Sequence, residues 1–128
     1  MPTSNPSPKI LFVDDEQPLL DVWVKFFTKR NFQVLTASSG EEGLKVIRRE
    51  KPALVVLDIR MPGMSGIDVL KELRKKDKTT KVIILTGYGT ADSVRVGAEM
   101  GVSDFIAKPF DLNRLCRMIE ETLGLPKT

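Results

Sequence analysis

Histidine is absent from this chain of 128 residues, and cysteine occurs once. Without histidine the chain cannot form a Ser-His-Asp triad, a histidine metal site or an imidazole acid–base pair. The single cysteine, Cys116, excludes an internal disulfide and a zinc site made of several cysteines. It falls in a predicted helix, where a lone cysteine usually serves as a small buried apolar residue.

Long apolar runs and a strong net charge are also lacking. No stretch approaches the length needed to cross a membrane. Residues 1–8 have neither the basic start nor the apolar run of a signal peptide, so we expect a flexible lead there and a cytoplasmic protein. The net charge is +3, and no aromatic residues interleave with the basic residues at 71–81. This favours a solvated helix end and turn over direct nucleic-acid binding.

The chain is 41% hydrophobic and 29% charged, which is typical of one globular domain with a real core. Short β-like runs alternate with amphipathic helical runs, and this pattern predicts five βα units and a parallel sheet. We expect one domain over residues 9–124, followed by a tail at 125–128. The expected strands are 9–13, 32–37, 53–57, 82–85 and 103–107; the expected helices begin near Pro18, Ser39 and Ser65 and cover 91–100 and 112–123.

Polar residues follow four of the expected strands. Asp14 and Asp15 follow the first strand, Asp58 the third, Thr86 the fourth and Lys108 the fifth. The carboxyl ends of parallel strands share one edge of a sheet, and ligands bind there. Taken singly, each residue is explained more readily by a helix cap, a turn or a surface position than by a functional site. Together they indicate a site for one divalent cation and one phosphoryl group.

Magnesium is the cation that this set of side chains favours. Carboxylates held close together raise the free energy of an empty site, and Mg²⁺ prefers oxygen ligands. Zinc and copper are poor candidates without histidine or thiolate ligands. Asp58 is the expected nucleophile, since its strand should be central, and it would form an acyl phosphate. Lys108 would neutralise the phosphoryl oxygens, and Thr86 would offer a hydroxyl donor.

Four motifs resemble the receiver domain of response regulators in two-component signalling. They are Phe12-Val13-Asp14-Asp15-Glu16, Leu57-Asp58-Ile59-Arg60-Met61-Pro62-Gly63-Met64-Ser65-Gly66, Leu85-Thr86-Gly87 and Lys108-Pro109-Phe110. The resemblance covers nearly everything from Lys9 to Leu123. It implies a single doubly wound, flavodoxin-like α/β domain, with a five-stranded parallel sheet in the order 2-1-3-4-5 and five helices on its two faces.

The resemblance implies roles at the site. Asp58 would accept a phosphoryl group from the phosphohistidine of a sensor kinase or phosphotransfer protein. Asp15, Asp58 and the backbone carbonyl of Arg60 would hold Mg²⁺, with Asp14 acting through water. Lys108 would contact the phosphoryl group. The protein would then be a signalling module that catalyses only its own phosphorylation and dephosphorylation, and not a turnover enzyme.

The resemblance also implies a switch. The Lys108–Pro109 bond would be cis, Thr86 would turn toward the phosphate, and Phe105 would rotate inward into the space that Thr86 leaves. The readout surface would be the fourth helix, the fifth strand and the last helix. That surface would control a downstream protein or output domain, and it could also join two copies of the chain.

Two large residues lie where the family flanks the path of the hydrolytic water. Arg60 is two residues past Asp58, and Tyr88 is two residues past Thr86. Bulk at these positions should hinder in-line attack by water on the phosphoryl group. We therefore expect slow self-dephosphorylation.

Other functions stay open at this point. A Mg²⁺-dependent phosphohydrolase with an aspartyl-phosphate intermediate is the main alternative, although enzymes of the haloacid-dehalogenase type place the nucleophile after the first strand. A flavodoxin-like nucleotide binder ranks lower, because Asp14 and Asp15 would repel a phosphate there. A degenerate receiver is disfavoured by the intact set of site residues. The cognate kinase, the input signal, the output target, the oligomeric state and membership of a longer regulator are left open.

Overall fold

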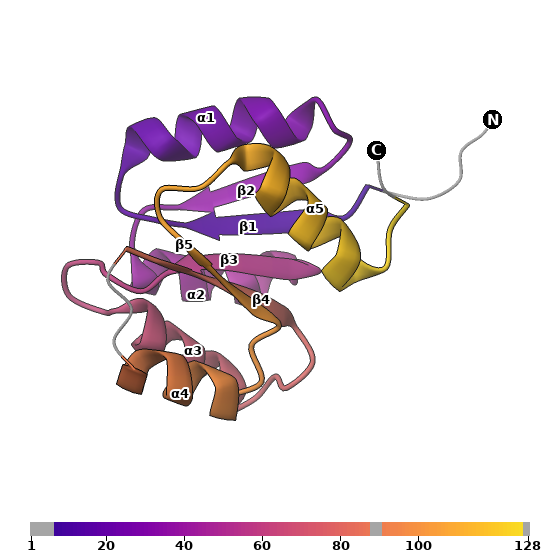
Figure 1. Ribbon diagram of the computed structural model, residues 1–128. Coiled ribbons are helices and arrows are strands. Elements are labelled where there is room, and N and C mark those ends of the chain that lie inside the picture. Colours follow the sequence, from indigo (N-terminus) through magenta and orange to yellow (C-terminus); the bar gives the residue numbers. More distant parts are fainter. Residues whose placement is uncertain (1–6, 88–90, 127–128) are drawn as a thin grey trace.

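The computed structural model describes residues 7–87 and 91–126, and strands and helices alternate through these ranges (Figure 1). The strands are β1 (Lys9–Val13), β2 (Gln33–Ala37), β3 (Leu54–Asp58), β4 (Lys81–Thr86) and β5 (Asp104–Ala107). The helices are α1 (Gln17–Thr28), α2 (Gly40–Glu50), α3 (Gly66–Arg74), α4 (Ala91–Glu99) and α5 (Leu112–Leu123). The predicted alternation of strands and helices is confirmed.

The strands form one parallel sheet in the order β2-β1-β3-β4-β5, which confirms the predicted doubly wound fold. β3 lies at the centre, between β1 and β4. Two strands run one residue further than we predicted, because Asp58 pairs with Leu85 and Thr86 pairs with Ala107. These two polar residues therefore end their strands instead of following them, and the sheet itself fixes their backbone positions.

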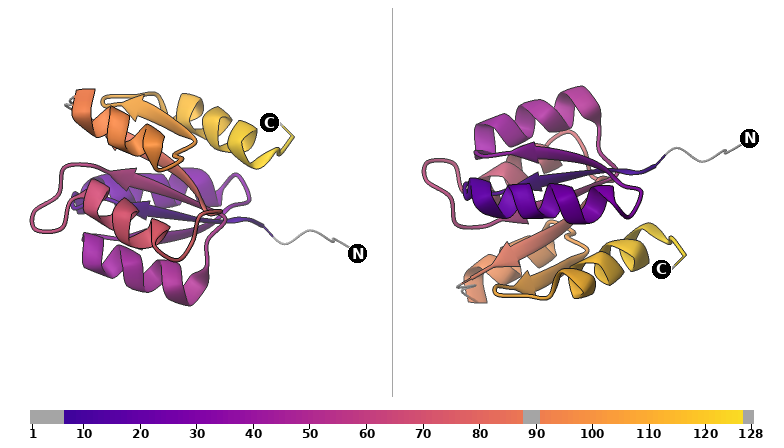
Figure 2. Two further views of the ribbon diagram at one scale, coloured as in Figure 1. Left: turned by 90° about the horizontal axis from the view of Figure 1, so that it is seen from below. Right: turned by 90° about the horizontal axis from the view of Figure 1, so that it is seen from above.

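Helices cover both faces of the sheet, as Figures 1 and 2 show. α1 and α5 pack on one face, and α2, α3 and α4 lie on the other. Ile10 and Phe12 of β1 join the core beneath α1 and α5, whereas Leu11 and Val13 join the core beneath α2 and α3. All residues of β3 are buried, as expected for a strand that is covered on both sides.

Aromatic packing ties α1 to the sheet and to the connection between β5 and α5. The ring centroids of Phe12 and Trp23 lie 5.3 Å apart, and those of Phe12 and Phe27 lie 5.1 Å apart. Trp23 also stacks on Phe110, with their ring centroids 6.1 Å apart. Since Phe110 comes two residues after Lys108, this stack helps to hold Lys108 near the carboxyl end of β1.

Side-chain caps set the starts of α2 and α3. Ser65 accepts a hydrogen bond from the Asp68 N–H, and the Asp68 carboxylate accepts one from the Ser65 N–H, so a capping box begins α3. At α2, Ser39 accepts the Glu42 N–H. The Glu42 carboxylate accepts from Ser38 and not from Ser39, so the second hydrogen bond of a capping box is shifted by one residue.

The last helix, α5, follows its sequence pattern. Asp111 accepts a hydrogen bond from the Asn113 N–H at 2.7 Å, and Gly124 ends the helix with a φ of 69°. Cys116 is buried in α5, as predicted. Of the helices in the described part of the chain, none has both the length and the apolar character needed to cross a bilayer.

Candidate functional site

Three carboxylates meet at the carboxyl edge of the sheet. Asp14 and Asp15 follow β1 directly, and Asp58 ends the neighbouring strand β3. One carboxylate oxygen from each residue lies within 4.8 Å of the other two. Asp14 is 0% exposed and Asp58 is 4% exposed, whereas Asp15 is exposed. Two of the three acids are therefore held away from solvent beside a third that faces it.

The ammonium of Lys108 lies among these acids. Its Nζ is 2.8 Å from Asp14 Oδ2 and 3.4 Å from Asp58 Oδ2. Glu16 Oε1 lies 3.9 Å from the same nitrogen, a contact that sequence reasoning missed. Lys108 thus links the segment after β5 to acids from both β1 and β3.

The charges of this cluster do not cancel. Burial and the neighbouring charge of Asp14 raise the pKa of Asp58, although Lys108 and a hydrogen bond from the Arg60 N–H act in the opposite direction. Burial alone would lower the pKa of Lys108, but its hydrogen bond to Asp14 and the nearby charges of Asp58 and Asp14 raise it. Lys108 therefore stays charged at neutral pH, and two buried carboxylates share its single positive charge.

Backbone N–H groups orient the two buried carboxylates. The Glu16 N–H donates to Asp14 Oδ1 at 3.0 Å, and the Arg60 N–H donates to Asp58 Oδ1 at 3.3 Å. Each acid therefore closes a short turn with the residue two positions later, as acidic residues commonly do after strands. In both carboxylates the Oδ2 atom is the one in contact with Lys108. The explanation by a turn, which we considered for each residue alone, thus holds for both Asp14 and Asp58. The two carboxylates nevertheless lie together at one site.

Thr86 brings a hydroxyl group to the same edge. Its Oγ1 is buried and has no hydrogen-bond partner among the described residues. The backbone carbonyl of Thr86 accepts the Lys108 N–H at 2.9 Å, which joins β4 to the segment that carries the ammonium. The Lys108–Pro109 bond is cis, as the family resemblance implied. A buried hydroxyl without a partner costs free energy, and an anionic oxygen at this edge would relieve that cost.

Gly66 was not predicted to matter, yet it sets how closely α3 approaches Asp58. A Cβ atom at this position would lie 2.2 Å from the carbonyl oxygen of Asp58, so only glycine fits. The Gly66 N–H donates to the carbonyl of Ile59 at 2.9 Å. The start of α3 is therefore pressed against the end of β3. The Ser-Gly pair at the helix start was the clue in the sequence, but the contact itself needs the tertiary structure.

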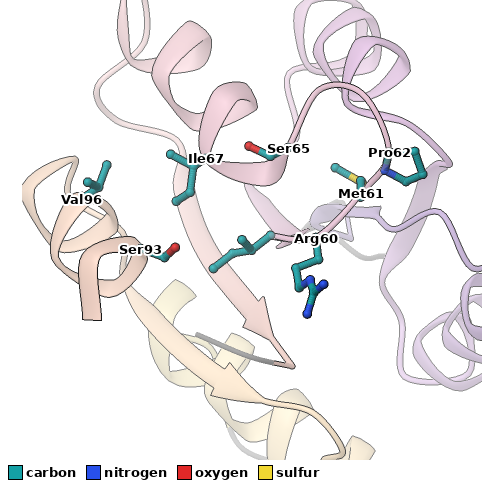
Figure 3. A pocket seen from close by; sticks show the side chains of 8 residues that line it. Arg60, Met61, Pro62, Ser65, Ile67, Ser93 and Val96 are labelled. Carbon is teal, nitrogen blue, oxygen red and sulfur yellow. The ribbon is translucent and has the colours of Figure 1, made fainter. Parts of the chain in front are cut away.

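A cavity of about 610 Å³ opens beside this edge, between the loop after β3 and α4. Figure 3 shows Ser65 and Ile67 at the start of α3, with Ser93 and Val96 opposite them on α4. Arg60 lies at the same cavity, and its guanidinium points away from Ser65. Arg60 is thus an exposed side chain that lines this cavity, two residues after Asp58.

The sequence also singled out Phe105 and Tyr88, and the structure describes Phe105 alone. Phe105 lies in β5, half-buried, with its ring against α4. A Cβ on Gly97 of α4 would lie 3.0 Å from Phe105 Cζ, so the ring packs directly on the helix backbone. Tyr88 lies outside the described residues.

Comparisons with known proteins agree on one family. Residues 10–120 match the family model of the response regulator receiver domain. Sporulation initiation phosphotransferase F of Bacillus subtilis is 36% identical over 117 residues, covering 91% of this chain and 94% of that protein. Transcriptional regulatory protein GlrR of Escherichia coli is 38% identical over 114 residues, covering 89% of this chain but 26% of that protein.

A solved structure gives the same answer. A response regulator receiver domain protein (CheY-like) from Methanospirillum hungatei superposes with a TM-score of 0.89 at 30% sequence identity, covering 92% of this chain and 94% of that chain. The chain therefore spans nearly the whole of some similar proteins and about a quarter of GlrR. What the remaining part of GlrR does is a property of that protein.

Proposed function

The chain belongs to the response regulator receiver domain family, and on this premise we propose that it is a phosphoacceptor module in which Asp58 carries the phosphoryl group. Receiver domains of response regulators are signalling modules that act between histidine kinases and output domains. The observation that carries the proposal is the placement of Asp58. It is a nearly buried carboxylate at the end of the central strand, 3.4 Å from an ammonium group.

The proposed reaction is an in-line transfer from a phosphohistidine. A carboxylate oxygen of Asp58 attacks the phosphorus and forms an O–P bond, while the P–N bond to the donor imidazole breaks. The electron pair leaves with the imidazole nitrogen, which takes up a proton. Lys108 holds its positive charge beside Asp58 throughout, where it can contact a phosphoryl oxygen. The Thr86 hydroxyl is a buried donor at the same edge.

The site residues fit a magnesium ion. The donors are oxygens only, from Asp14, Asp15 and Asp58, and we propose that the backbone carbonyl of Arg60 joins them. Lys108 leaves part of the buried negative charge uncompensated, which supports a further cation. When bound, Mg²⁺ would neutralise charge on the phosphoryl oxygens. Asp14 is the most buried of the three acids, and we propose that it binds Mg²⁺ through a water molecule. Its contact with Lys108 would then stay in place.

The output step is proposed to pass through Thr86 and Phe105. Thr86 would turn its hydroxyl toward the phosphoryl group, and Phe105 would follow into the space that is vacated. The half-buried ring of Phe105 against α4 supports this coupling, because it links β5 to a helix on the surface. The α4-β5-α5 surface would then contact a downstream protein, an output domain or a second copy of the chain. A phosphohistidine donor also supports our prediction of a cytoplasmic location.

Intact-mass measurement after incubation with acetyl phosphate tests the proposal. We expect one phosphoryl adduct on the wild-type chain with Mg²⁺, and none with EDTA or in the Asp58→Asn variant. Glu41→Gln, at an exposed acid of α2, is the matched control and should still form the adduct. Steady release of phosphate without an adduct would support the phosphohydrolase instead. Neither adduct nor release would indicate a degenerate receiver.

A further inference from the structure

A groove of about 740 Å³ lies at the end of the sheet opposite Asp58. It runs between the ends of α2 and α3 and the connection that leads from α3 into β4, and Figure 1 shows this connection at the far end from the loop after β3. The buried side chains of Leu44, Ile47 and Leu73 form its apolar floor. The groove shares no residue with the acidic cluster, so Asp58 chemistry does not account for it.

The rim of the groove is strongly cationic. Five basic residues line it: Arg48, Lys51, Lys75, Lys76 and Lys78. Lys75 pairs with Glu72, with 2.6 Å between Nζ and Oε2. The side chains of the other four are exposed, and no residue in the described ranges forms a hydrogen bond or ion pair with them. Four exposed cations without an ion-pair partner among the described residues therefore border the apolar floor.

The groove is also lined by two acids, Glu72 and Asp77, and Asp77 forms hydrogen bonds within its own loop. The Asp77 carboxylate accepts the N–H groups of Thr79 and Thr80, at 2.9 and 3.0 Å, and both of their hydroxyl groups. Arg74, the cation at the end of α3, points elsewhere, since it donates to the carbonyls of Met100 and Asp77. The loop is thus held in shape by its own contacts, and the rim cations are left facing solvent.

We propose that this groove docks an acidic segment of a partner protein. Carboxylates of the segment would face Arg48, Lys51, Lys76 and Lys78, and an apolar side chain between them would cover the floor. Charge complementarity selects the acidic partner. The apolar floor favours a protein segment over a nucleic acid, because none of the described residues that line the groove is aromatic and could stack on a base. This goes beyond the phosphoacceptor function and does not depend on it.

Selection of short random peptides displayed on phage, with the full chain as bait, tests the proposal. We expect selected peptides with acidic residues on both sides of Leu, Ile or Phe. Synthetic copies should bind Lys51→Glu/Lys76→Glu/Lys78→Glu at least about tenfold more weakly than wild type. Lys25→Glu/Lys29→Glu/Arg114→Glu is the matched control, because it changes three exposed cations on α1, its C-cap and α5 by the same charge, and it should bind normally.

Further readouts separate this proposal from the others. Replacing the central apolar residue of a selected peptide by Ser should also weaken binding, and added salt should weaken it further. Both triple variants should still form the acetyl phosphate adduct, so a failure here is distinct from a failure at Asp58. The proposal is overturned if no selected peptide depends on the rim lysines. It is equally overturned if a single-stranded DNA oligonucleotide occupies the groove more tightly than the selected peptides.

Discussion

Among the described residues, Lys108 is the cation in contact with both buried carboxylates of the site, Asp14 and Asp58. It lies 2.8 Å from a carboxylate that is 0% exposed and 3.4 Å from a second that is nearly buried. Removing one partner of a buried ion pair leaves the other charge desolvated and unpaired, which costs more than the pair itself contributes. The stability of this edge should therefore depend on Lys108 when no metal is bound.

We predict that Lys108→Met destabilises the metal-free protein by about 2 kcal/mol or more. The loss should shrink in saturating Mg²⁺, because the cation then takes over the compensation of Asp14 and Asp58. Urea unfolding with EDTA and with Mg²⁺ measures both values. Lys76→Met, at an exposed lysine of the groove, should change stability by about 0.5 kcal/mol or less. Equal losses in the two conditions would contradict the shared role.

The position of Arg60 leads to a prediction about the rate at which Asp58 loses its phosphoryl group. The Arg60 side chain is exposed and lines the cavity beside the loop that follows Asp58. Arg60→Ala should shorten the lifetime of the Asp58 phosphoryl group severalfold, because water gains an open path for in-line attack. Decay of the mass adduct after removal of acetyl phosphate measures this. Pro62→Ala, which changes another residue of the cavity, is the control, and an unchanged decay in Arg60→Ala would refute the shielding role.

Sequence reasoning could identify some of these residues and not others. Asp14, Asp58 and Lys108 could be found because chemically reactive side chains follow apolar strands, and strand ends converge in a parallel sheet. Gly66 could not be assigned its role, because the 2.2 Å approach to Asp58 is a contact between two backbones that no residue pattern reports. Glu16 was overlooked because an exposed acid in an acidic run has no distinguishing pattern.

Among the secondary-structure elements, α4 is the helix that packs on the ring of the predicted switch residue Phe105. Gly97 lies where a Cβ would stand 3.0 Å from Cζ and 3.1 Å from Cε1 of Phe105. An alanine in a helix interior is favoured over glycine by about 1 kcal/mol. Crowding a packed ring typically costs about 1–3 kcal/mol. The two effects oppose each other at this one position.

We predict that Gly97→Ala destabilises the wild-type chain by up to about 2 kcal/mol, because the crowding of Phe105 exceeds the gain in helix propensity. In a Phe105→Leu background the same substitution should stabilise by up to about 1 kcal/mol, since the ring edge is gone. A double-mutant cycle by urea unfolding measures this coupling. If Gly97→Ala changed the free energy of unfolding with the same sign in both backgrounds, the Phe105 ring would not pack on α4 as described.

The connection from α3 to β4 contains a titrating group. The hydrogen bond from the Thr80 hydroxyl, with those from the N–H groups of Thr80 and Thr79, lowers the pKa of Asp77 from 3.8 to about 2, against the effect of burial. Because the folded state binds fewer protons than the unfolded state between these values, Asp77 stabilises the fold above pH 3.8. That contribution is lost as the pH falls toward about 2.

Asp77→Asn should therefore lower the urea midpoint at about pH 5 and make little difference near pH 2. The amide keeps an acceptor but not the charge, so the difference between the two proteins isolates the titration. Glu41→Gln, at an exposed acid of α2, is the control for loss of one carboxylate. A constant difference between wild type and Asp77→Asn at both pH values would show that the lowered pKa does not contribute.

Element boundaries were predictable to within a residue at most ends, and the misses have physical causes. Phe32 was placed in the second strand for its apolar character, but β2 begins at Gln33, and Phe32 packs instead against Phe27, with ring centroids 5.9 Å apart. Asp58 and Thr86 were placed outside strands because polar residues usually end them. Backbone pairing with Leu85 and Ala107 extends both strands regardless of the side chain.

The whole molecule should respond to magnesium, because the acidic cluster joins residues after β1 to the end of β3 at the centre of the sheet. A ligand that binds the folded state alone stabilises by about 2.7 kcal/mol at a hundredfold excess over its dissociation constant. We predict a gain of that size for the wild-type chain. Asp15→Asn should lose much of it, whereas Glu41→Gln should keep it. A melting temperature that is the same with and without Mg²⁺ would count against the site.

At this scale the alternation of strands and helices, with a continuous apolar third strand, predicted a parallel sheet, and the strand order followed from the family resemblance. The groove at the opposite end of the sheet was not predicted. Its cations at 75–78 were interpreted from the sequence as part of a solvated helix end and turn, since nothing in the chain order reveals that Leu44, Ile47 and Leu73 form an apolar floor beside them. Binding surfaces built from the ends of several elements become visible only after folding.

Trp23 is the sole tryptophan, and it is 3% exposed between Phe12 and the Phe110 segment. The molecule therefore contains an intrinsic fluorophore whose emission arises from one known place. Loss of its apolar surroundings on unfolding would shift that emission to longer wavelength without any label. Because its indole stacks on the segment that follows Lys108, the same signal can be recorded during titrations of the acidic edge, and its intensity would register rearrangements there in real time.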